Sequence, residues 1–378
     1  SLGPTPRRTG APAGRRGRPA GLMAPPLGLS IESEADLMNI SNEQGLPPLQ
    51  RGDSFNLSDT GTFQRTDFKV SRDGIGGLDI SGEERRLRGV KILLDDLEMT
   101  EELGQGASGI VRKAIHKPTG VIVAVKTVNI TDKGKRSQMV NELRSLTQSQ
   151  CPFLVGLHDA FYEEMQVHMV LEFMDGGDLS DLVRASSEQN GGVGGIRSEE
   201  VLFKIATQVL HGLSYLHRQR HQVHRDMKPA NLMRTKDGRV KISDFGISSS
   251  LDSTMGMCST FVGTANYMSP ERLSGAEYSY PSDIWSFGLI VLELIRGAYP
   301  YPNASNYFQL LNNIIEGDVP AVPQDAGLSA DLCDFVASCL RKEPAQRPTV
   351  TELQAHRWMK RFDSDEMDLS MKLEDVKL

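Results

Sequence analysis

The sequence predicts an α+β protein in which a small β-rich lobe precedes a larger α-helical lobe, with a cleft between the two. Two β-branched runs, Ile110–His116 and Val121–Asn129, open the ordered region. Helical repeats dominate after Ser198, and Ile284–Ile295 is apolar almost all round, as in a helix at the centre of a core. A β-rich piece followed by a helical piece favours two lobes and a binding cleft where they meet.

Local signals place the elements of this region in chain order. The turn Lys117–Gly120 joins the two β-branched runs into a hairpin. Apolar periodicity predicts a helix near Lys135–Gln148, and Val167–Glu172 is a further strand candidate. Ser198 suits the N-cap of a helix whose apolar residues recur at helical spacing, namely Leu202, Ile205, Val209, Leu213 and Leu216. Gly297 can end the apolar helix.

The composition is that of a globular protein from a reducing compartment. The 378 residues are 39% apolar and 24% charged, which allows a sizeable core. The net charge of −7 argues against a dedicated nucleic-acid binder, and no apolar stretch approaches the roughly 18 residues of a membrane span. Four scattered cysteines do not form a disulfide framework: Cys151, Cys258, Cys333 and Cys339. We expect a cytoplasmic location, with the nucleus as an alternative, and no nucleic-acid or membrane partner.

The chain divides into four segments by composition. Residues 1–75 are expected to form a disordered N-terminal regulatory tail, because residues 1–28 hold twelve Gly or Pro and the rest of the tail is polar and irregular. Residues 76–96 lead into the ordered domain, which we place at 97–362. Residues 363–378 carry six acids against two lysines, and we expect them to form an acidic C-terminal tail.

Three glycines mark the start of the ordered domain. Gly104, Gly106 and Gly109 form a G-x-G-x-x-G pattern, and Val111 follows. A dinucleotide-binding version of this pattern needs a helix next and an acidic residue about 20 positions further on. Here strands follow and position 126 is a lysine, so the glycines suit a hairpin tip whose backbone N–H groups lie over phosphates. A plain turn is the alternative.

A lysine on the following strand can reach the same phosphates. Strand periodicity puts Ala124 and Lys126 on one face, where the small alanine leaves room for a flat base. Such a lysine needs an anionic partner to fix it, and Glu142 on the next helix is the candidate. A solvated charge on the helix surface is the alternative interpretation of Glu142.

The most specific pattern lies in the second half of the chain. The segment His224–Asn231 reads H-R-D-x-K-x-x-N, and Asp244-Phe245-Gly246 follows it. With the glycines and the lysine strand, these motifs occur in the order that protein kinases share, and the chain resembles that family over about 97–362. The resemblance implies the bilobal protein kinase fold, with ATP and Mg²⁺ in the cleft, and it makes residues 76–96 a pre-kinase segment.

The resemblance implies a role for each catalytic-loop residue. Asp226 would orient the substrate hydroxyl and accept its proton, and Lys228 would face the transferred phosphoryl group. Asn231 and Asp244 would supply oxygen ligands to Mg²⁺. Phosphoryl transfer depends on such positioning and charge neutralisation more than on covalent catalysis.

The resemblance also implies an ATP pocket around the hairpin. Lys126, paired with Glu142, would hold the α- and β-phosphates. Leu171 would guard the back of the adenine pocket, and Glu172–Met174 would form the hinge. Further ATP-binding residues would be Gly104, Gly106, Gly109, Val111 and Ala124.

Two supporting contacts are expected in the helical lobe. Ser269-Pro270-Glu271 stands where the family often has A-P-E, and Arg347 would pair with Glu271. Asp283 would brace the backbone of the catalytic loop. A zinc site is the less favoured interpretation of three histidines that are separated by three and by two residues, His217, His221 and His224. No cysteine lies near them, and the catalytic-loop motif already includes the last of the three.

The stretch Thr260–Leu273 resembles the activation segment of MAP kinase kinases, and Met174–Gly177 and Asp226–Asn231 resemble the corresponding parts of these enzymes. Five residues separate Thr254 from Thr260, which is the plant-type spacing of the activating phosphorylation sites. The resemblance implies a dual-specificity kinase that phosphorylates Thr and Tyr in the T-x-Y loop of a MAP kinase, after an upstream MAP kinase kinase kinase has phosphorylated it. Another Ser/Thr kinase of the same cascade is one alternative. A pseudokinase scaffold is a second, although the residues it would lack are present: Lys126, Asp226 and Asp244.

The N-terminal tail carries a candidate docking motif. Arg15, Arg16 and Arg18 precede Leu27 and Leu29. A basic cluster followed by alternating apolar residues resembles the MAP kinase docking motif, and its chemistry suits an acidic patch beside an apolar groove. A solvated disordered arm is the alternative, because the spacer is long and Pro-rich.

Deletion of residues 1–31 should therefore raise the KM for a MAP kinase, because the deleted segment would dock the substrate outside the active site. Phosphate transfer to a short peptide, which has no docking groove, should stay unchanged and serves as the control. Initial rates with the two substrates measure both effects. An unaltered KM for the MAP kinase would favour the solvated arm.

Overall fold

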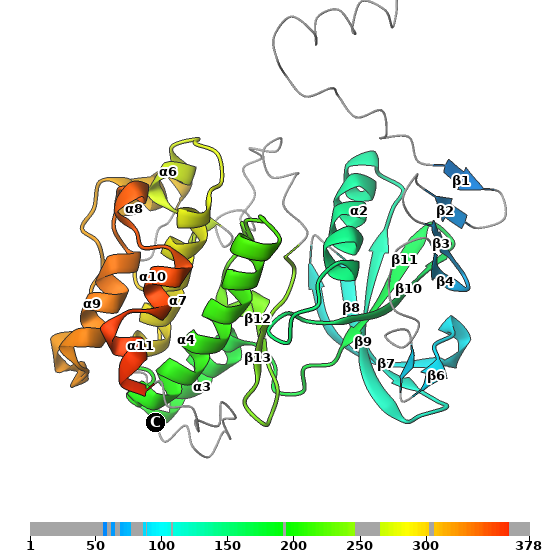
Figure 1. Ribbon diagram of the computed structural model, residues 1–378, viewed down its shortest axis with the longest axis horizontal. Coiled ribbons are helices and arrows are strands. Elements are labelled where there is room, and N and C mark those ends of the chain that lie inside the picture. Colours follow the sequence, from blue (N-terminus) through cyan, green and yellow to red (C-terminus); the bar gives the residue numbers. More distant parts are fainter. Residues whose placement is uncertain are drawn as a thin grey trace, which may run out of the picture. The chain divides into compact units, whose positions relative to one another are not determined.

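The computed structural model describes residues 56–58, 62–64, 69–76, 86–87, 89–106, 109–191, 194–245, 265–301 and 306–362 (Figure 1). All of them belong to one compact unit, Ser54–Leu378. The predicted docking residues of the N-terminal tail, as well as Thr254 and Thr260, lie outside the described residues. Within the described ranges, no helix is long and apolar enough to cross a membrane.

A five-stranded antiparallel sheet forms the first part of this unit, in the order β10-β11-β9-β8-β7. Its strands are β7 (Leu97–Gly106), β8 (Gly109–His116), β9 (Val121–Asn129), β10 (Leu157–Glu163) and β11 (Gln166–Glu172). The predicted hairpin is confirmed, since β8 and β9 pair from Ile110↔Thr127 to His116↔Val121. The sequence analysis did not predict strands β7 and β10. Strand β7 is exposed along nearly its whole length, and its sequence therefore shows no apolar alternation.

Helix α2 (Lys133–Thr147) connects β9 to β10 and carries Glu142. It begins two residues before the predicted start, because Asp132 caps it by accepting a hydrogen bond from the backbone N–H of Lys135. The apolar face of α2, which includes Met139 and Leu143, is buried in the main core. This burial fixes the rotation of the helix and therefore the direction of Glu142.

Helices make up most of the remaining unit. They are α3 (Leu179–Gln189), α4 (Glu199–Ser214), α6 (Pro270–Leu273), α7 (Tyr280–Arg296), α8 (Tyr307–Ile315), α9 (Ala330–Cys339), α10 (Val350–Gln354) and α11 (Arg357–Phe362). A short hairpin, β12 (Leu232–Arg234) and β13 (Val240–Ile242), lies between the sheet and these helices (Figure 1). As predicted, Ser198 caps α4, and Gly297 ends α7 in the left-handed conformation with φ +69°.

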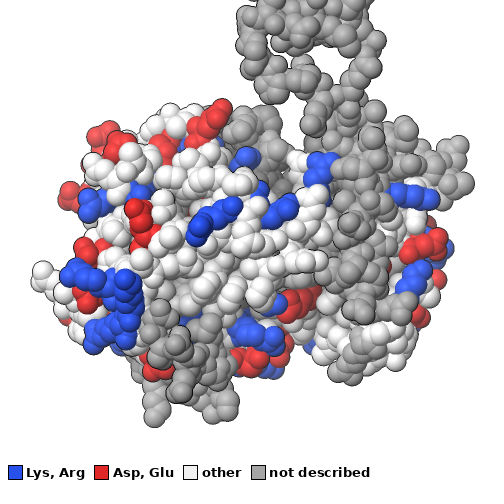
Figure 2. All heavy atoms as spheres, viewed as in Figure 1, with Lys and Arg blue, Asp and Glu red and all other residues white. Residues whose placement is uncertain are grey.

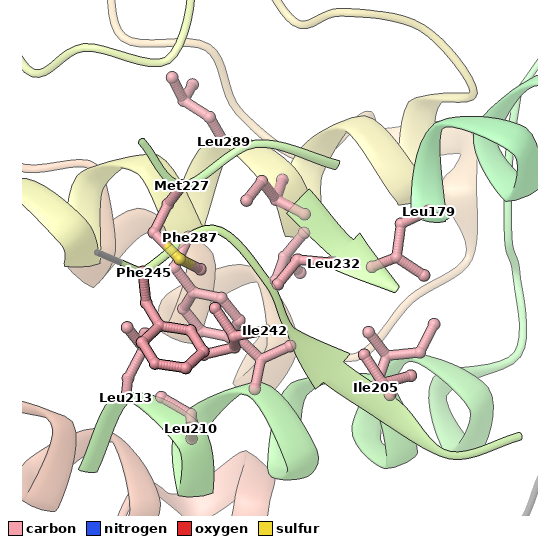
Figure 3. Close-up of a cluster of buried hydrophobic side chains, with 14 of the residues drawn as sticks. Leu179, Ile205, Leu210, Leu213, Met227, Leu232, Ile242, Phe245, Phe287 and Leu289 are labelled. Atoms are coloured by element: carbon pink, nitrogen blue, oxygen red, sulfur yellow. The ribbon is translucent and has the colours of Figure 1, made fainter. Parts of the chain in front are cut away.

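Helix α7 lies at the centre of the core, and every residue from Ser282 to Ile295 is buried. Figure 3 shows Phe287 and Leu289 of this helix among side chains from α4, the β12–β13 hairpin and two connecting segments. Among the latter, Met227 and Phe245 are the chain neighbours of Asp226 and Asp244, and both are almost completely buried. The core therefore fixes the backbone of both predicted active-site carboxylates.

The structure differs from the expectation that residues 1–75 are disordered. A second antiparallel sheet contains β1 (Asn56–Ser58), β2 (Thr62–Gln64), β3 (Lys69–Ser71) and β4 (Gly74–Gly76), and β5 (Arg86–Leu87) pairs with β6 (Val90–Lys91). Val70 and Ile75 are 0% and 2% exposed, and the Ile75 N–H donates to Asp159 Oδ1 of β10 at 3.1 Å. Val70 and Ile75 are too few to give this polar segment a recognisable apolar periodicity. Both side chains are nevertheless buried in the main core.

A loop follows α3, and its described residues are Asn190, Gly191 and Gly194–Ile196. The described part of this loop is fixed to the end of α7: the N–H groups of Gly195 and Ile196 donate to the carbonyl oxygens of Ile295 and Leu294 at 3.0 and 2.8 Å. Helix ends leave such carbonyls without partners inside the helix. The loop therefore completes the C-terminus of the central helix.

The predicted pair of Glu271 and Arg347 is present, with Arg347 buried and Glu271 half-buried. Arg347 donates from both terminal nitrogens to the two Glu271 carboxylate oxygens, at 2.8 and 2.7 Å. The Arg347 side chain is 0% exposed. Burial opposes ionisation of Glu271, but the hydrogen bonds from Arg347 outweigh it and hold the pKa of this carboxyl below its ordinary value.

Arg347→Ala should lower the free energy of unfolding by about 3–5 kcal/mol, because it leaves the Glu271 carboxylate buried without its cation. Chemical denaturation of the full chain measures the change. Arg357→Ala is the matched control, because Arg357 makes an exposed pair with Asp334, and such pairs contribute about 0–1 kcal/mol. Equal effects of the two substitutions would contradict the assignment of a buried pair.

Candidate active site

A cavity of about 250 Å³ lies between the five-stranded sheet and the β12–β13 hairpin. It is lined by seven of the residues predicted to bind ATP: Gly104, Val111, Ala124, Lys126, Leu171, Glu172 and Met174. Asn231 and Asp244, the predicted metal ligands, line it as well. Gly106, Gly109 and Glu142 line a neighbouring cavity of about 310 Å³ instead.

Phe173 of the predicted hinge lines the first cavity as well. Sequence reasoning missed the six remaining residues that line it: Leu103, Val155, Asp178, Ala230, Met233 and Ser243. Leu103, Ala230 and Ser243 each adjoin a motif residue, so adjacency in the chain was an available signal. Val155 and Asp178 lie outside every motif, and only the fold brings them here. The apolar members give the cavity the surface that a flat aromatic base requires.

The glycine hairpin approaches its neighbouring strand closely at one position. Gly109 has φ +133°, and a Cβ atom there would collide with the carbonyl oxygen of Thr127 on β9. Only glycine fits such a backbone without strain. Nothing lies within 4 Å of the Cβ positions of Gly104 and Gly106, which leaves this part of the hairpin open.

Lys126 joins two carboxylates from distant parts of the chain. Its Nζ lies 2.7 Å from Glu142 Oε1 on α2 and 2.8 Å from Asp244 Oδ1 after β13. The side chains of Lys126 and Glu142 are 2% and 4% exposed, whereas that of Asp244 is 31% exposed toward the cavity that it lines. The ion pair expected from the sequence is therefore present, and the same ammonium group also holds Asp244.

The protonation states follow from this arrangement. Burial alone would lower the pKa of Lys126, but the charges of Asp244 and Glu142 outweigh it and hold the pKa above its ordinary value. Burial also opposes ionisation of Asp244, yet the lysine charge and hydrogen bond keep the pKa of this carboxyl below its usual range. At neutral pH the cavity therefore presents a charged lysine and an ionised Asp244.

The residues of the catalytic-loop motif meet around one carboxylate oxygen. Asp226 Oδ2 accepts from Lys228 Nζ at 2.8 Å and from Asn231 Nδ2 at 3.0 Å. Asn231 Nδ2 also donates to the Asp226 carbonyl oxygen at 2.7 Å. His224 Nδ1 accepts from the Asp226 N–H at 3.2 Å, and its Nε2 donates to the Ser243 carbonyl oxygen at 2.9 Å. These bonds join the loop to Ser243, the residue before Asp244.

Asp283 of α7 braces this loop, as predicted. Its two carboxylate oxygens accept from the backbone N–H groups of His224 and Arg225 at 2.8 and 2.9 Å, and from His217 Nε2 at 2.7 Å. Arg225 and Asp244 have φ +75° and +55°, which is uncommon for residues other than glycine. Strained backbone of this kind persists only where the surroundings fix it, and Asp283 provides that constraint for Arg225.

The three histidines weighed as zinc ligands do not gather around a common point. His217 bonds to Asp283, and His224 bonds to the loop backbone. The part of the chain that the structure describes holds no group of three or more His, Cys, Asp or Glu side chains that could bind a metal ion. A zinc site built from side chains alone therefore has no support in the described residues.

The chain belongs to the protein kinase family, because the family model "Protein kinase domain" matches residues 97–359. Within that family it is a MAP kinase kinase. It is 38% identical to mitogen-activated protein kinase kinase 1 of Arabidopsis thaliana over 342 residues, which cover 88% of this chain and 94% of the relative. It is 37% identical to SIPKK of Nicotiana tabacum over 85% of this chain and 91% of the relative. It is 40% identical to MAP kinase kinase PBS2 of Saccharomyces cerevisiae over 74% of this chain and 42% of the relative.

Membership of the family makes the protein a phosphotransferase that uses ATP. The geometry agrees with this activity in its placement of charge: a fixed lysine beside a cavity, an ionised carboxylate facing it, and a second carboxylate on the adjoining loop. Positioned charge is what phosphoryl transfer requires of a protein.

Asp283→Ala should lower kcat about 100-fold, because small displacements of a catalytic group have effects of this size. The Asp226 loop would lose two backbone anchors, whereas the ATP cavity, which Asp283 does not line, should keep its KM for ATP. Steady-state kinetics measure both quantities. Asp334→Ala, which removes an exposed carboxylate, is the control, and a folded Asp283→Ala protein with the parent kcat would contradict the bracing role.

Proposed function

We propose that this protein phosphorylates both Thr and Tyr in the T-x-Y activation loop of a MAP kinase, and that phosphorylation by an upstream MAP kinase kinase kinase activates it. The observation that carries the proposal is the bond network that joins Lys126, Glu142 and Asp244 on one side of the cavity, with Asp226, Lys228 and Asn231 beside it. The names of its relatives support the choice of substrate class.

Asp226 is proposed as the group that orients the acceptor hydroxyl and takes its proton. Its Oδ2 already accepts from Lys228 and Asn231, so Oδ1 is the oxygen that would face the hydroxyl. The two donors also fix the carboxylate plane, which aligns the acceptor for in-line attack on the terminal phosphate. Lys228 lies close enough to neutralise charge on the transferred phosphoryl group.

Asn231 and Asp244 fit the binding of Mg²⁺ by the chemistry of their side chains. Asn231 uses its NH₂ group on Asp226, which directs its amide oxygen away from that residue. Asp244 uses Oδ1 on Lys126 and keeps its second carboxylate oxygen for a ligand. Mg²⁺ is usually held by one or two protein oxygens together with substrate phosphates, which agrees with these two ligands. When bound, the ion would neutralise the charge of the ATP phosphates.

The mechanism is tested by Asp226→Asn in the full chain, with inactive MAP kinase as acceptor. The substitution should preserve fold and ATP binding and reduce the transfer rate by about 10²–10⁴-fold, the usual contribution of a positioned base. Radiolabelled phosphate transfer measures the rate, and unfolding and ATP titrations provide the controls. A rate within threefold of the parent would contradict the role of Asp226, and no transfer by the activated parent would favour a scaffold.

The proposed switch is phosphorylation of Thr254 and Thr260. Each phosphate would add about −1.5 to −2 charges and three acceptor oxygens, and Arg225 beside Asp226 is the proposed receiver. Thr254→Asp with Thr260→Asp should raise basal activity, and Ala at both positions should block activation by an upstream kinase. Activity assays with phosphosite mapping test this. Activation of the double-Ala protein, or phosphate only on Ser248–Ser250, would place the switch elsewhere.

A further inference from the structure

The hairpin of β3 and β4, residues 69–76, covers the edge of the five-stranded sheet. Strand β10 forms that edge, and both strands of the hairpin pack against it (Figure 1). Proteins commonly cover such an edge, because an open one can pair with another chain. This hairpin also places two apolar side chains, Val70 and Ile75, in the main core.

A buried carboxylate on β10 anchors the hairpin. Asp159 is 1% exposed, and its Oδ1 accepts from the backbone N–H groups of Ile75 at 3.1 Å and of Ala160 at 2.8 Å. A buried carboxylate costs stability unless it is hydrogen-bonded, so the hairpin supplies part of the compensation. The pairing register of β10 shifts between Leu157 and Asp159, and a β-bulge of this kind redirects a side chain.

Gly74 allows the hairpin to approach this carboxylate closely. Its φ is +112°, and a Cβ atom there would lie 2.9 Å from Asp159 Oδ2 and 3.0 Å from Oδ1. A side chain would therefore meet both a strained backbone and a close contact, which glycine avoids. Gly89 has φ +82°, but nothing lies within 4 Å of its Cβ position. Gly74 thus serves a contact with β10, whereas Gly89 serves only a turn.

The anchored hairpin shares its core with α2. Val70 and Ile75 belong to the same buried cluster as three residues of that helix, Met139, Val140 and Leu143. The separate buried cluster of the sheet contains none of these five residues. Packing of the hairpin therefore supports the helix whose carboxylate reaches the buried lysine of the ATP cavity.

We propose that Asp159, acting through the hairpin, is a positioning residue that holds α2 where Glu142 can bond to Lys126. Neither Asp159 nor the hairpin lines the cavity assigned to ATP, so both act from a distance. The inference rests on the proposed function only for the role of Lys126 in holding the ATP phosphates. It does not depend on which protein accepts the phosphate.

The test follows amide hydrogen exchange and acceptor-free ATP hydrolysis in the full chain. Ile75→Asp puts a charge into the core and should expel the hairpin, so that exchange of the hairpin and α2 amides rises tenfold or more, as expected for losing a hydrogen bond to a charged group. The rate of ATP hydrolysis should fall about 10–100-fold, because Glu142 no longer fixes Lys126. The amides of α7 should keep their protection.

Two controls separate positioning from stability. Ile122→Asp makes the same chemical change on the surface of β9, where Ile122 is 41% exposed, and should leave exchange and hydrolysis unchanged. Leu353→Ala opens the core at α10, where Leu353 is 0% exposed, and lowers the stability of the helical lobe. While the protein stays folded, Leu353→Ala should keep the parent rate. An equal loss of rate in Leu353→Ala and Ile75→Asp would contradict the proposal.

Gly74→Ala decides the question if Ile75→Asp does not fold. It should raise exchange of the α2 amides about tenfold by weakening the bond to Asp159, whereas Gly89→Ala, which adds comparable backbone strain, should not. If the hairpin amides lose protection while α2 and ATP hydrolysis keep their parent values, the hairpin only covers the sheet and the proposal is wrong. A parent that hydrolyses ATP but phosphorylates no MAP kinase would refute the proposed function and leave this test decisive.

Discussion

The buried ammonium group of Lys126 is the constraint on which the rest of the site depends. A lysine that is 2% exposed is tolerated only because Glu142 and Asp244 compensate its charge at 2.7 and 2.8 Å. Those two carboxylates come from α2 and from the segment after β13, so one cation joins three separate elements. Any movement that separates α2 from the sheet would break the Lys126–Glu142 pair and leave Asp244 alone to compensate the buried ammonium group.

Helix α7, which lies inside the core, holds the loop that carries Asp226. It contributes Asp283, Ser286 and Glu293, and their spacing places these three residues on one side of the helix. Asp283 holds the loop that carries Asp226, whereas Ser286 and Glu293 bond to Tyr267 of the neighbouring segment. Because the helix is fully packed, groups about one to three turns apart keep constant positions relative to each other.

Local signals were sufficient for the β8–β9 hairpin and for the caps at Ser198 and Gly297. The pairs Lys126–Glu142 and Glu271–Arg347 also agree with prediction, although the second spans 76 residues, because the resemblance to protein kinases marked both partners. The sequence was insufficient where no motif marks the two partners of a contact. The bond from Tyr267 to Glu293 spans 26 residues, and Ile75 reaches Asp159 across 84. No periodicity or turn chemistry encodes such contacts, because tertiary packing alone decides them.

In the proposed function, the protein is an active MAP kinase kinase whose charged residues form one catalytic unit. Mass-spectrometric mapping of an inactive MAP kinase, after incubation with the activated full chain and Mg²⁺-ATP, tests that function most directly. Phosphate is expected on both the Thr and the Tyr of the T-x-Y loop, and none is expected with the Lys126→Met protein. Phosphate on only one of the two residues, or equal phosphorylation by Lys126→Met, would contradict it.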